Sequence, residues 1–224
     1  MTIKIAHIAD VHFRALARHD EYKQVFEAFA ADMIANGVNH VFVGGDIFHT
    51  KTTGLSPEYI DLMSWWLDLL ARAVEPLDGA VHLTLGNHDG NLVNSTRQDA
   101  VSPIVRAVGN PRVKLYKKSG VYQFAPGYNW CVFSLFDTDG WKNVRPIAGD
   151  VNIACYHGPV SGARTESNWI IEDEVTIDFF RSYDYCFLGD IHATQFLEFR
   201  DQEIIIDTAD LIHYPGADVI EELP

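Results

Sequence analysis

Aspartate, histidine and asparagine follow the ends of five short apolar runs, and these residue types are common metal ligands. The groups are Asp10-Val-His12, Asp46 with His49, Asn87-His88-Asp89, His157, and Asp190-Ile-His192. In open α/β sheets, ligands bind outside the carboxyl ends of the strands, so five such ends indicate one shared site. One histidine alone near a strand end would more often be a hydrogen-bonded structural residue, and the interpretation therefore depends on the whole set.

The donor types indicate a pair of divalent metal ions. Oxygen and imidazole donors without thiolates suit manganese, iron or zinc. Seven donors exceed what one ion with open positions can use, and they suit two ions that share a bridging carboxylate and activate a water molecule. These donors are Asp10, His12, Asp46, Asn87, His157, Asp190 and His192. We expect His88 to act as a general acid or phosphate-orienting group, with Asp89 holding its ring.

The elements that must position these residues can be predicted from periodicity. Helices are expected at residues 20–37 (with Gly37 as the C-terminal cap), 56–74 (with Ser56 as cap) and 97–108 (with a fresh start near Ser102). Short apolar runs rich in β-branched and aromatic residues predict strands. They lie at residues 3–10, 40–46, 80–89, 130–137, 151–158, 183–192 and 203–216. The first half alternates strand and helix, as α/β folds do, and the second half has little helix, which suggests a second sheet.

Composition narrows the class of protein. The chain has 224 residues, 47% apolar and 21% charged, and we interpret residues 1–224 as one domain. No run approaches the roughly 20 apolar residues of a membrane span, and the N-terminus has no signal-peptide shape, so we expect a cytoplasmic protein without membrane contact. The three cysteines lie in apolar runs and are expected to be buried, reduced thiols. A net charge of −14 argues against a protein that coats nucleic acid by bulk charge.

The motifs D-x-H, G-G-D, G-N-H-D, a lone H-G and a final G-x-x-H, in this order, resemble the calcineurin-like metallophosphoesterases. The resemblance covers nearly the whole chain. It implies a four-layer α/β/β/α sandwich, with two mixed sheets flanked by helices and a dimetal centre above the sheet edges. By analogy, one metal is held by Asp10, His12, Asp46 and His192. The other is held by Asp46, Asn87, His157 and Asp190, so Asp46 bridges the two.

Within that family, the chain resembles the SbcD-type double-strand-break repair nucleases, including their phage relatives. It lacks the Asp-Arg-Gly and G-N-H-E motifs of the protein phosphatases and instead has Gly-Gly-Asp-x-Phe-His at residues 44–49. The YPGA sequence at 214–217 resembles the Tyr-Pro-Gly-Ser that closes the nuclease domain in that group. The resemblance implies that His49 contacts the nucleic-acid backbone. The alternative is that His49 is a hydrogen-bond partner of Asp46.

The chain departs from those nucleases in three ways. Their final motif is G-H-x-H, whereas this chain has Asp190 at the first histidine position; aspartate is a competent oxygen donor and should favour tighter metal binding. Their capping domain and ATPase-docking segment are absent from this chain, which is either a fragment or a stand-alone minimal phosphoesterase. The excess of acidic residues weakens the case for a DNA substrate, although single basic side chains near the site could still bind its phosphates. The candidates are Arg14 and Arg164, as weak substrate-binding residues, and Lys51, Arg97 and Arg106.

These observations predict a metal-dependent phosphodiesterase that hydrolyses DNA in repair through a metal-activated hydroxide. Manganese is the expected ion, with iron, zinc and magnesium as alternatives. The substrate could instead be a small nucleotide or a phosphoprotein. A third reading, from another functional class, is a metal-stabilised scaffold for an SMC-like ATPase of the SbcC type. The sequence leaves open the exonuclease or endonuclease preference and a homodimeric state.

Overall fold

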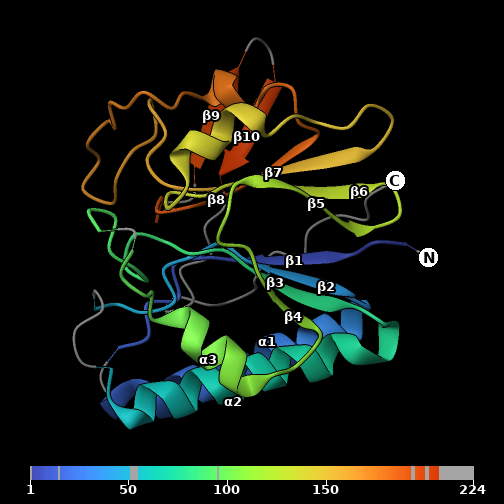
Figure 1. The fold of residues 1–224 in the computed structure, drawn as a ribbon, viewed down its shortest axis with the longest axis vertical. Helices are drawn as coiled ribbons and strands as arrows, with labels where there is room; N and C mark the ends of the chain where they lie inside the picture. The colour runs from blue at the N-terminus through green and yellow to red at the C-terminus, as the bar shows by residue number, and fades with distance from the viewer. Residues whose placement is uncertain are drawn as a thin grey trace.

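Two four-stranded sheets face each other in the computed structural model of the chain, with three α-helices on the outer side of the first sheet (Figure 1). The structure describes residues 2–14, 16–50, 55–94 and 96–192, together with the backbone of strands 195–199 and 202–206. The YPGA sequence at 214–217 and Lys51 lie outside the described residues.

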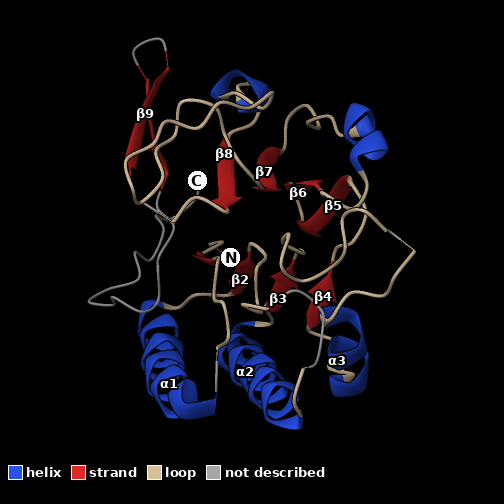
Figure 2. Cartoon of the chain, turned by 90° about the vertical axis from the view of Figure 1, so that its left-hand side faces the viewer, coloured by secondary structure: helices blue, strands red, loops and turns tan. Residues whose placement is uncertain are grey.

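The first sheet is parallel in all of its pairings. It consists of β1 (Ile5–Ile8), β2 (His40–Val43), β3 (Ala80–Leu83) and β4 (Val113–Leu115), in that spatial order. Parallel neighbours need crossover connections, and these are the helices α1 (His19–Asn36), α2 (Pro57–Val74) and α3 (Val101–Val108). Figure 2 shows all three helices on one side of this sheet. The three predicted helices are therefore confirmed, except that α3 begins at Val101 instead of residue 97 and the side chain of Ser56 makes no capping hydrogen bond at the start of α2. Gly37 caps α1 in the left-handed conformation.

The second sheet is mixed. Strand β5 (Gly120–Ala125) is antiparallel to β6 (Tyr128–Phe133), whereas β7 (Val151–His157) and β8 (Tyr185–Gly189) continue the sheet in parallel. A hairpin of β9 (Gln195–Phe199) and β10 (Gln202–Ile206) follows. The sandwich is confirmed, but the expectation of two mixed sheets is wrong for the first, because a helix follows each of its first three strands. Strands β4, β5 and β9 were not predicted.

The outer side of the second sheet is covered by short 3₁₀ helices. These are η3 (Thr138–Asn143) and η4 (Ile177–Phe180), whose Trp141 and Phe180 pack with Phe133 and Tyr156 of the sheet. The remaining 3₁₀ segments, η1 (Leu16–Arg18) and η2 (Glu75–Leu77), lie next to α1 and α2. The fourth layer therefore consists of loops and 3₁₀ turns in the described residues, where the family resemblance implied helices.

The two sheets are joined by an aromatic and aliphatic core. Phe42 of β2 packs against Trp130 of β6 with ring centroids 4.8 Å apart, and both side chains are fully buried. Along β6, Trp130 and Val132 face the first sheet, whereas Cys131 and Phe133 face outward, as the alternation of a strand requires. Burying these apolar surfaces fixes the distance between the sheets, and with it the distance between the loops at their edges.

Two expectations from composition can be compared with the structure. All three cysteines are free; Cys131 and Cys155 are buried, and Cys186 is partly buried. Of the helices in the described residues, none has the length and apolar character needed to cross a membrane.

A chain of polar side chains runs through the core between the sheets. The Nδ1 of His40 lies 3.1 Å from the Nε2 of His82, and the Nδ1 of His82 lies 2.9 Å from the hydroxyl of Tyr116. The rings of Phe124 and Trp130 surround the pair. Burial lowers the pKa of His40 to about 4 and holds the pKa of His82 well below its ordinary value. Both imidazoles are therefore neutral in the folded protein at pH 7.

This pair should make stability depend on pH. An unfolded histidine has a pKa near 6.5. Between about pH 6.5 and pH 4, His40 and His82 therefore bind protons in the unfolded chain but stay neutral in the folded chain. The free energy of unfolding should fall as the pH falls through that range, by up to about 1.4 kcal/mol per pH unit for each buried histidine. In His82→Gln, which can hydrogen-bond but cannot titrate, this slope should be smaller. Urea unfolding at a series of pH values measures this slope. An unchanged slope in the variant would contradict the conclusion that His82 is buried in its neutral form.

Candidate metal centre

The loops that follow β1, β2, β3, β7 and β8 converge at one edge of the two sheets. Backbone hydrogen bonds tie the first two loops together: the Asp10 amide donates to the Gly45 carbonyl at 3.1 Å, and the His12 amide donates to the Asp46 carbonyl at 2.9 Å. The strands of the first sheet are parallel, and so are β7 and β8, which is why their carboxyl ends meet. The structure therefore brings together all five groups predicted from the sequence.

Glycines make this close approach possible. Gly45 has a φ of 97°, and a Cβ at that position would lie 2.6 Å from the Gly86 amide nitrogen and 2.7 Å from the Nδ1 of His157. A Cβ on Gly86 would collide with the Asp46 carboxylate. The glycines of the G-G-D and G-N-H-D motifs are thus required by packing, because no side chain fits between the loops.

The carboxylate of Asp46 lies at the centre of the site, with 1% of the residue exposed. Its Oδ1 is 3.3 Å from the Nε2 of His157, and its Oδ2 is 3.7 Å from the Nε2 of His12. The backbone amide of His88 also donates to Oδ1 at 2.8 Å. The two oxygens thus face histidines on opposite sides, which is the geometry that a carboxylate bridging two ions needs.

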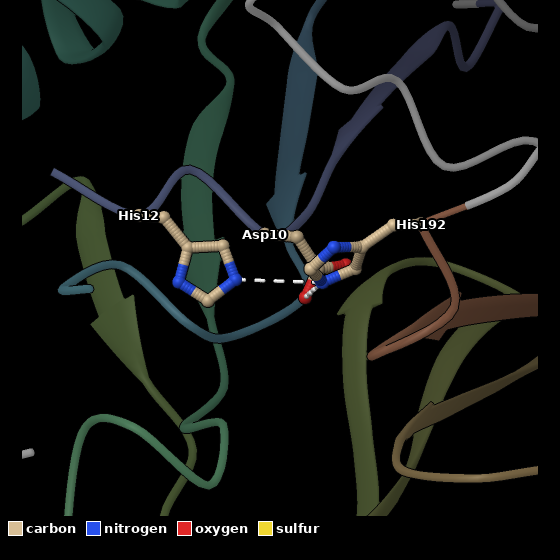
Figure 3. A group of neighbouring side chains, drawn as sticks. All are labelled: Asp10, His12 and His192. Carbon is tan, nitrogen blue, oxygen red and sulfur yellow. Dashed lines mark hydrogen bonds and ion pairs between the residues drawn. The ribbon is translucent and has the colours of Figure 1, made fainter. Parts of the chain in front are cut away.

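On one side of Asp46, three side chains form a first cluster. The Nε2 of His12 is 3.4 Å from the Nε2 of His192, and the latter is 3.6 Å from the Oδ1 of Asp10. Figure 3 shows the two imidazoles pointing toward each other, with the Asp10 carboxylate beside the His192 ring. The nearby carboxylate of Asp10 raises the pKa of His192, whereas burial lowers the pKa of His12 to about 4. At neutral pH, His12 therefore has a lone pair available for an ion.

On the other side, His157 comes from the second sheet and is 2% exposed. Its Nδ1 donates to the carbonyl of Gly44 at 2.7 Å, which leaves Nε2 directed at the Asp46 carboxylate. Burial opposes protonation of this ring, but the negative charge of Asp46, whose Oδ1 lies 3.3 Å from Nε2, outweighs burial and raises the pKa of His157 to about 10. Without a bound cation, a proton on His157 thus offsets the buried carboxylate charge, and an ion would displace that proton.

Asn87 and Asp190 complete this side of the site. The amide nitrogen of Asn87 donates to the Oδ1 of Asp190 at 3.0 Å, and the same oxygen is 4.0 Å from the Nε2 of His157. The backbone amide of Asp190 donates to both carboxylate oxygens of Asp10, at 3.1 and 3.0 Å. Asp190 thus links the two halves of the site, although it is not part of the tight groups of three that surround Asp10 and Asp46.

The backbone of the site is strained at its ligand candidates. Six described non-glycine residues have a positive φ, and four of them belong to the site. Each costs on the order of 1 kcal/mol, an energy that the surrounding hydrogen bonds must offset. The four are Asp10, His12, Asp46 and Asp190, with φ values of 54°, 47°, 51° and 75°.

The donor set fits divalent cations. Buried polar atoms without a hydrogen-bond partner in the described structure include the Nε2 of His157 and the Oδ1 of Asn87, and each is a competent ligand atom. Bonds of about 2.0–2.2 Å place the ligand atoms of one ion about 3 to 4.3 Å from one another. The separations of 3.3 to 4.0 Å between facing donors fall in that range. Two ions on either side of Asp46 would satisfy these atoms.

His88 lies outside the first cluster but close to it. Its Nδ1 is 2.7 Å from the carbonyl oxygen of His49, and its Nε2 is 4.0 Å from the Oδ2 of Asp46. The side chain is 29% exposed, so the ring can face both the site and solvent. Donation from Nδ1 to that carbonyl would leave Nε2 to act on a substrate oxygen.

The expected contact between Asp89 and the His88 ring is wrong. Asp89 is completely buried, and its Oδ1 accepts hydrogen bonds from the amides of Ile47 and Phe48, whereas its Oδ2 accepts one from the amide of Gly86. Burial raises the pKa of Asp89 to about 7. Asp89 holds the loops after β2 and β3 together, and the backbone of His49 takes the role of orienting His88.

An open cleft of about 340 Å³ lies over the cluster, and His49 lines it. The His49 ring centroid is 5.5 Å from that of His12 and 6.2 Å from that of His88. Arg14 and Arg164 also line the cleft, whereas the exposed Arg97 and Arg106 are not among its lining residues. Glu166 was missed by sequence reasoning; its Oε1 is 3.9 Å from the Nδ1 of His192. It lies in an exposed loop after β7, where no spacing pattern marks it.

Comparison with known proteins decides the family. The model of the calcineurin-like phosphoesterase family matches residues 3–194. The chain belongs to this family. It is also 37% identical over 210 residues to the uncharacterized protein R555 of Acanthamoeba polyphaga mimivirus, a match that covers 86% of this chain and 15% of the viral protein. The chain thus spans a small part of that relative's length.

The crystal structure of the Pseudomonas putida nuclease MPE is a more distant match. The similarity has a TM-score of 0.39 and 13% sequence identity, and it covers 75% of this chain and 66% of the nuclease.

The position of Asp46 predicts how metal content will respond to mutation. The wild-type protein, loaded with manganese and desalted, should approach two equivalents of metal by elemental analysis. Asp46→Ala should lose at least one equivalent, because the bridging oxygens are gone, and Asp46→Asn should also bind less while preserving the shape of the side chain. Glu172→Ala removes the same charge from an exposed position and should keep both ions. Two retained ions in both Asp46 variants would refute the bridge.

Proposed function

We propose that this phosphoesterase is a metal-dependent phosphodiesterase that hydrolyses DNA, of the repair-nuclease kind, with manganese as its ion. The observation that carries the proposal is the position of His49. It lies three residues after Asp46, in the open cleft, with its ring 5.5 Å from that of His12. A residue placed there can contact a phosphate without joining the buried ligand set. An SMC-like ATPase partner belongs to the same proposal and comes from the motif resemblance alone.

The site divides the work among its residues. Two bound cations would withdraw charge from the phosphoryl oxygens and lower the pKa of a water molecule between them. Asp46 and its neighbours would supply the negative charge that binds the ions and would set the distance between them. The exposed edge of His88 then faces the leaving oxygen, where an imidazole that carries a proton on Nε2 can donate it. His49, Arg14 and Arg164 bind the phosphate chain from the cleft walls.

The acidic balance of the chain limits how DNA can bind. With a net charge of −14, attraction at long range is weak, so binding depends on local cations and on the ions themselves. Arg14 suits this role, because its half-buried side chain has a buried Nε without a hydrogen-bond partner in the described structure. A phosphate oxygen in the cleft would supply that partner.

The role of His88 can be separated from metal binding. His88→Ala should keep both metal ions and lose activity by roughly two to four powers of ten, the usual range for an acid–base group. Elemental analysis and the rate on a chromogenic phosphodiester give the two measurements. If the variant loses an ion together with its activity, His88 is a ligand, as its 4.0 Å approach to Asp46 would allow.

The proposed substrate is tested by hydrolysis of labelled double- and single-stranded DNA and of a chromogenic phosphodiester, with and without manganese. Wild-type protein should cut DNA only with metal. His49→Ser should keep its metal, lose DNA hydrolysis strongly and lose small-diester hydrolysis much less, because a misplaced scissile phosphate can cost on the order of a hundredfold.

Arg106→Ser is the control for a lost surface cation and should change neither rate. Equal loss on both substrates in His49→Ser would mean that His49 only supports the metal site. Activity on mononucleotides or phosphoproteins without any cleavage of DNA would replace the proposal with its alternatives. Metal binding without hydrolysis of any phosphoester would favour the scaffold.

A further inference from the structure

The two halves of the site differ in their donor atoms. On the side of Asp10, the facing groups are two imidazoles, His12 and His192, together with carboxylate oxygens. On the side of His157, the groups are one imidazole, two carboxylates and the amide oxygen of Asn87. The difference arises at Asp190, where a histidine would have given both sides two nitrogens.

Asp190 also controls the orientation of Asn87. One carboxylate oxygen of Asp190 accepts the hydrogen bond from the Asn87 amide nitrogen at 3.0 Å. This bond turns the amide so that its oxygen, which is buried and has no partner in the described structure, remains available to a cation. The same oxygen faces the Nε2 of His157 at 4.0 Å, and because a carboxylate oxygen has more than one lone pair, it can accept the Asn87 hydrogen bond and also bind an ion.

The geometry supports a shared ion on this side. The Nε2 of His157, which is buried and without a partner in the described structure, lies 3.3 Å from the Oδ1 of Asp46 and 4.0 Å from the Oδ1 of Asp190. Both separations would allow the two atoms to bind one ion, because atoms with bonds of about 2.1 Å to the same ion lie at most about 4.2 Å apart. The backbone of Asp190 is fixed by its two hydrogen bonds to Asp10.

We propose that Asp190 makes the two metal positions unequal, so that the His157 side prefers hard divalent cations such as magnesium and manganese, whereas the His12–His192 side accepts zinc or iron. Oxygen donors suit magnesium and manganese, and imidazole suits zinc and iron. This inference rests on the proposed two-metal function but adds a preference that the function does not require. The wild-type protein would then bind two different ions from a mixture.

The experiment is calorimetric titration of the metal-free protein with zinc, manganese and magnesium separately, fitted to two sites. In the wild type, manganese should bind at the His157 site at least as tightly as at the His12–His192 site. Zinc should bind tightly only at the His12–His192 site. Asp190→His should tighten zinc at the second site by about tenfold or more and weaken magnesium there by a similar factor, while the first site stays unchanged. Asp139→His, which adds an exposed imidazole elsewhere, should change neither.

Asp190→Asn separates binding from orientation. Asparagine keeps an oxygen that can accept the Asn87 hydrogen bond but removes the negative charge, so manganese affinity at the second site should fall by about tenfold or more. Wild-type affinity in Asp190→Asn, or an unchanged zinc preference in Asp190→His, would overturn the inference. Two bound ions with no effect of Asp190 would refute only this inference. A wild-type protein that binds no divalent ion would instead refute the proposed function.

Discussion

Asp46 carries a buried negative charge at the point where loops from both sheets meet. Only 1% of the residue is exposed, and its neighbours include a second buried carboxylate, Asp10, at 6% exposure. Burying such charges without compensation costs several kcal/mol, so the surrounding groups must supply positive charge. In the metal-free chain, a proton on His157 does so, because Asp46 raises the pKa of that ring to about 10. Divalent cations would compensate better, and the unpartnered atoms that face Asp46 are the ones they would bind.

The rest of the architecture follows from keeping these loops in contact. His157 donates to the Gly44 carbonyl, and Asp190 donates to Asp10, so each sheet holds the other's loops through direct hydrogen bonds. The apolar core between Phe42 and Trp130 sets the spacing behind them. Asp89 accepts hydrogen bonds from three backbone amides in the loops after β2 and β3 and so holds these loops together. We therefore expect the stability of the fold and the geometry of the site to be coupled through a small number of buried polar contacts.

The strained backbone has the same origin. Asp10, Asp46 and Asp190 all adopt a positive φ in the loops that follow β1, β2 and β8. The cost of on the order of 1 kcal/mol at each residue is offset by backbone bonds such as that between Asp10 and Gly45.

The sequence by itself determined the strand–helix alternation and the set of residues that meet at one sheet edge. It could do so because Asp, His and Asn follow apolar runs at five places, and parallel strands put their carboxyl ends together. The capping residue Gly37 and the start of α2 at Pro57 were also predictable, because these are local preferences. Strands β4 and β5 were not, since neither forms an apolar run long enough to distinguish it from a loop.

Only the tertiary structure decided how the site residues divide their roles. Asp89 is next to His88 in the sequence, but in the folded chain its side chain is buried and accepts hydrogen bonds from backbone amides. The His88 ring forms its hydrogen bond with the carbonyl of His49 instead. Likewise, Glu166 approaches His192 only because the loop after β7 folds back over the cleft. Asp190 is an aspartate in the sequence, yet its hydrogen bond with Asn87 depends on two residues more than a hundred positions apart. Residue type and order determine which side chains meet at the metal centre. Their orientation depends on buried hydrogen bonds between loops that are distant in the sequence, and no local sequence pattern encodes those bonds.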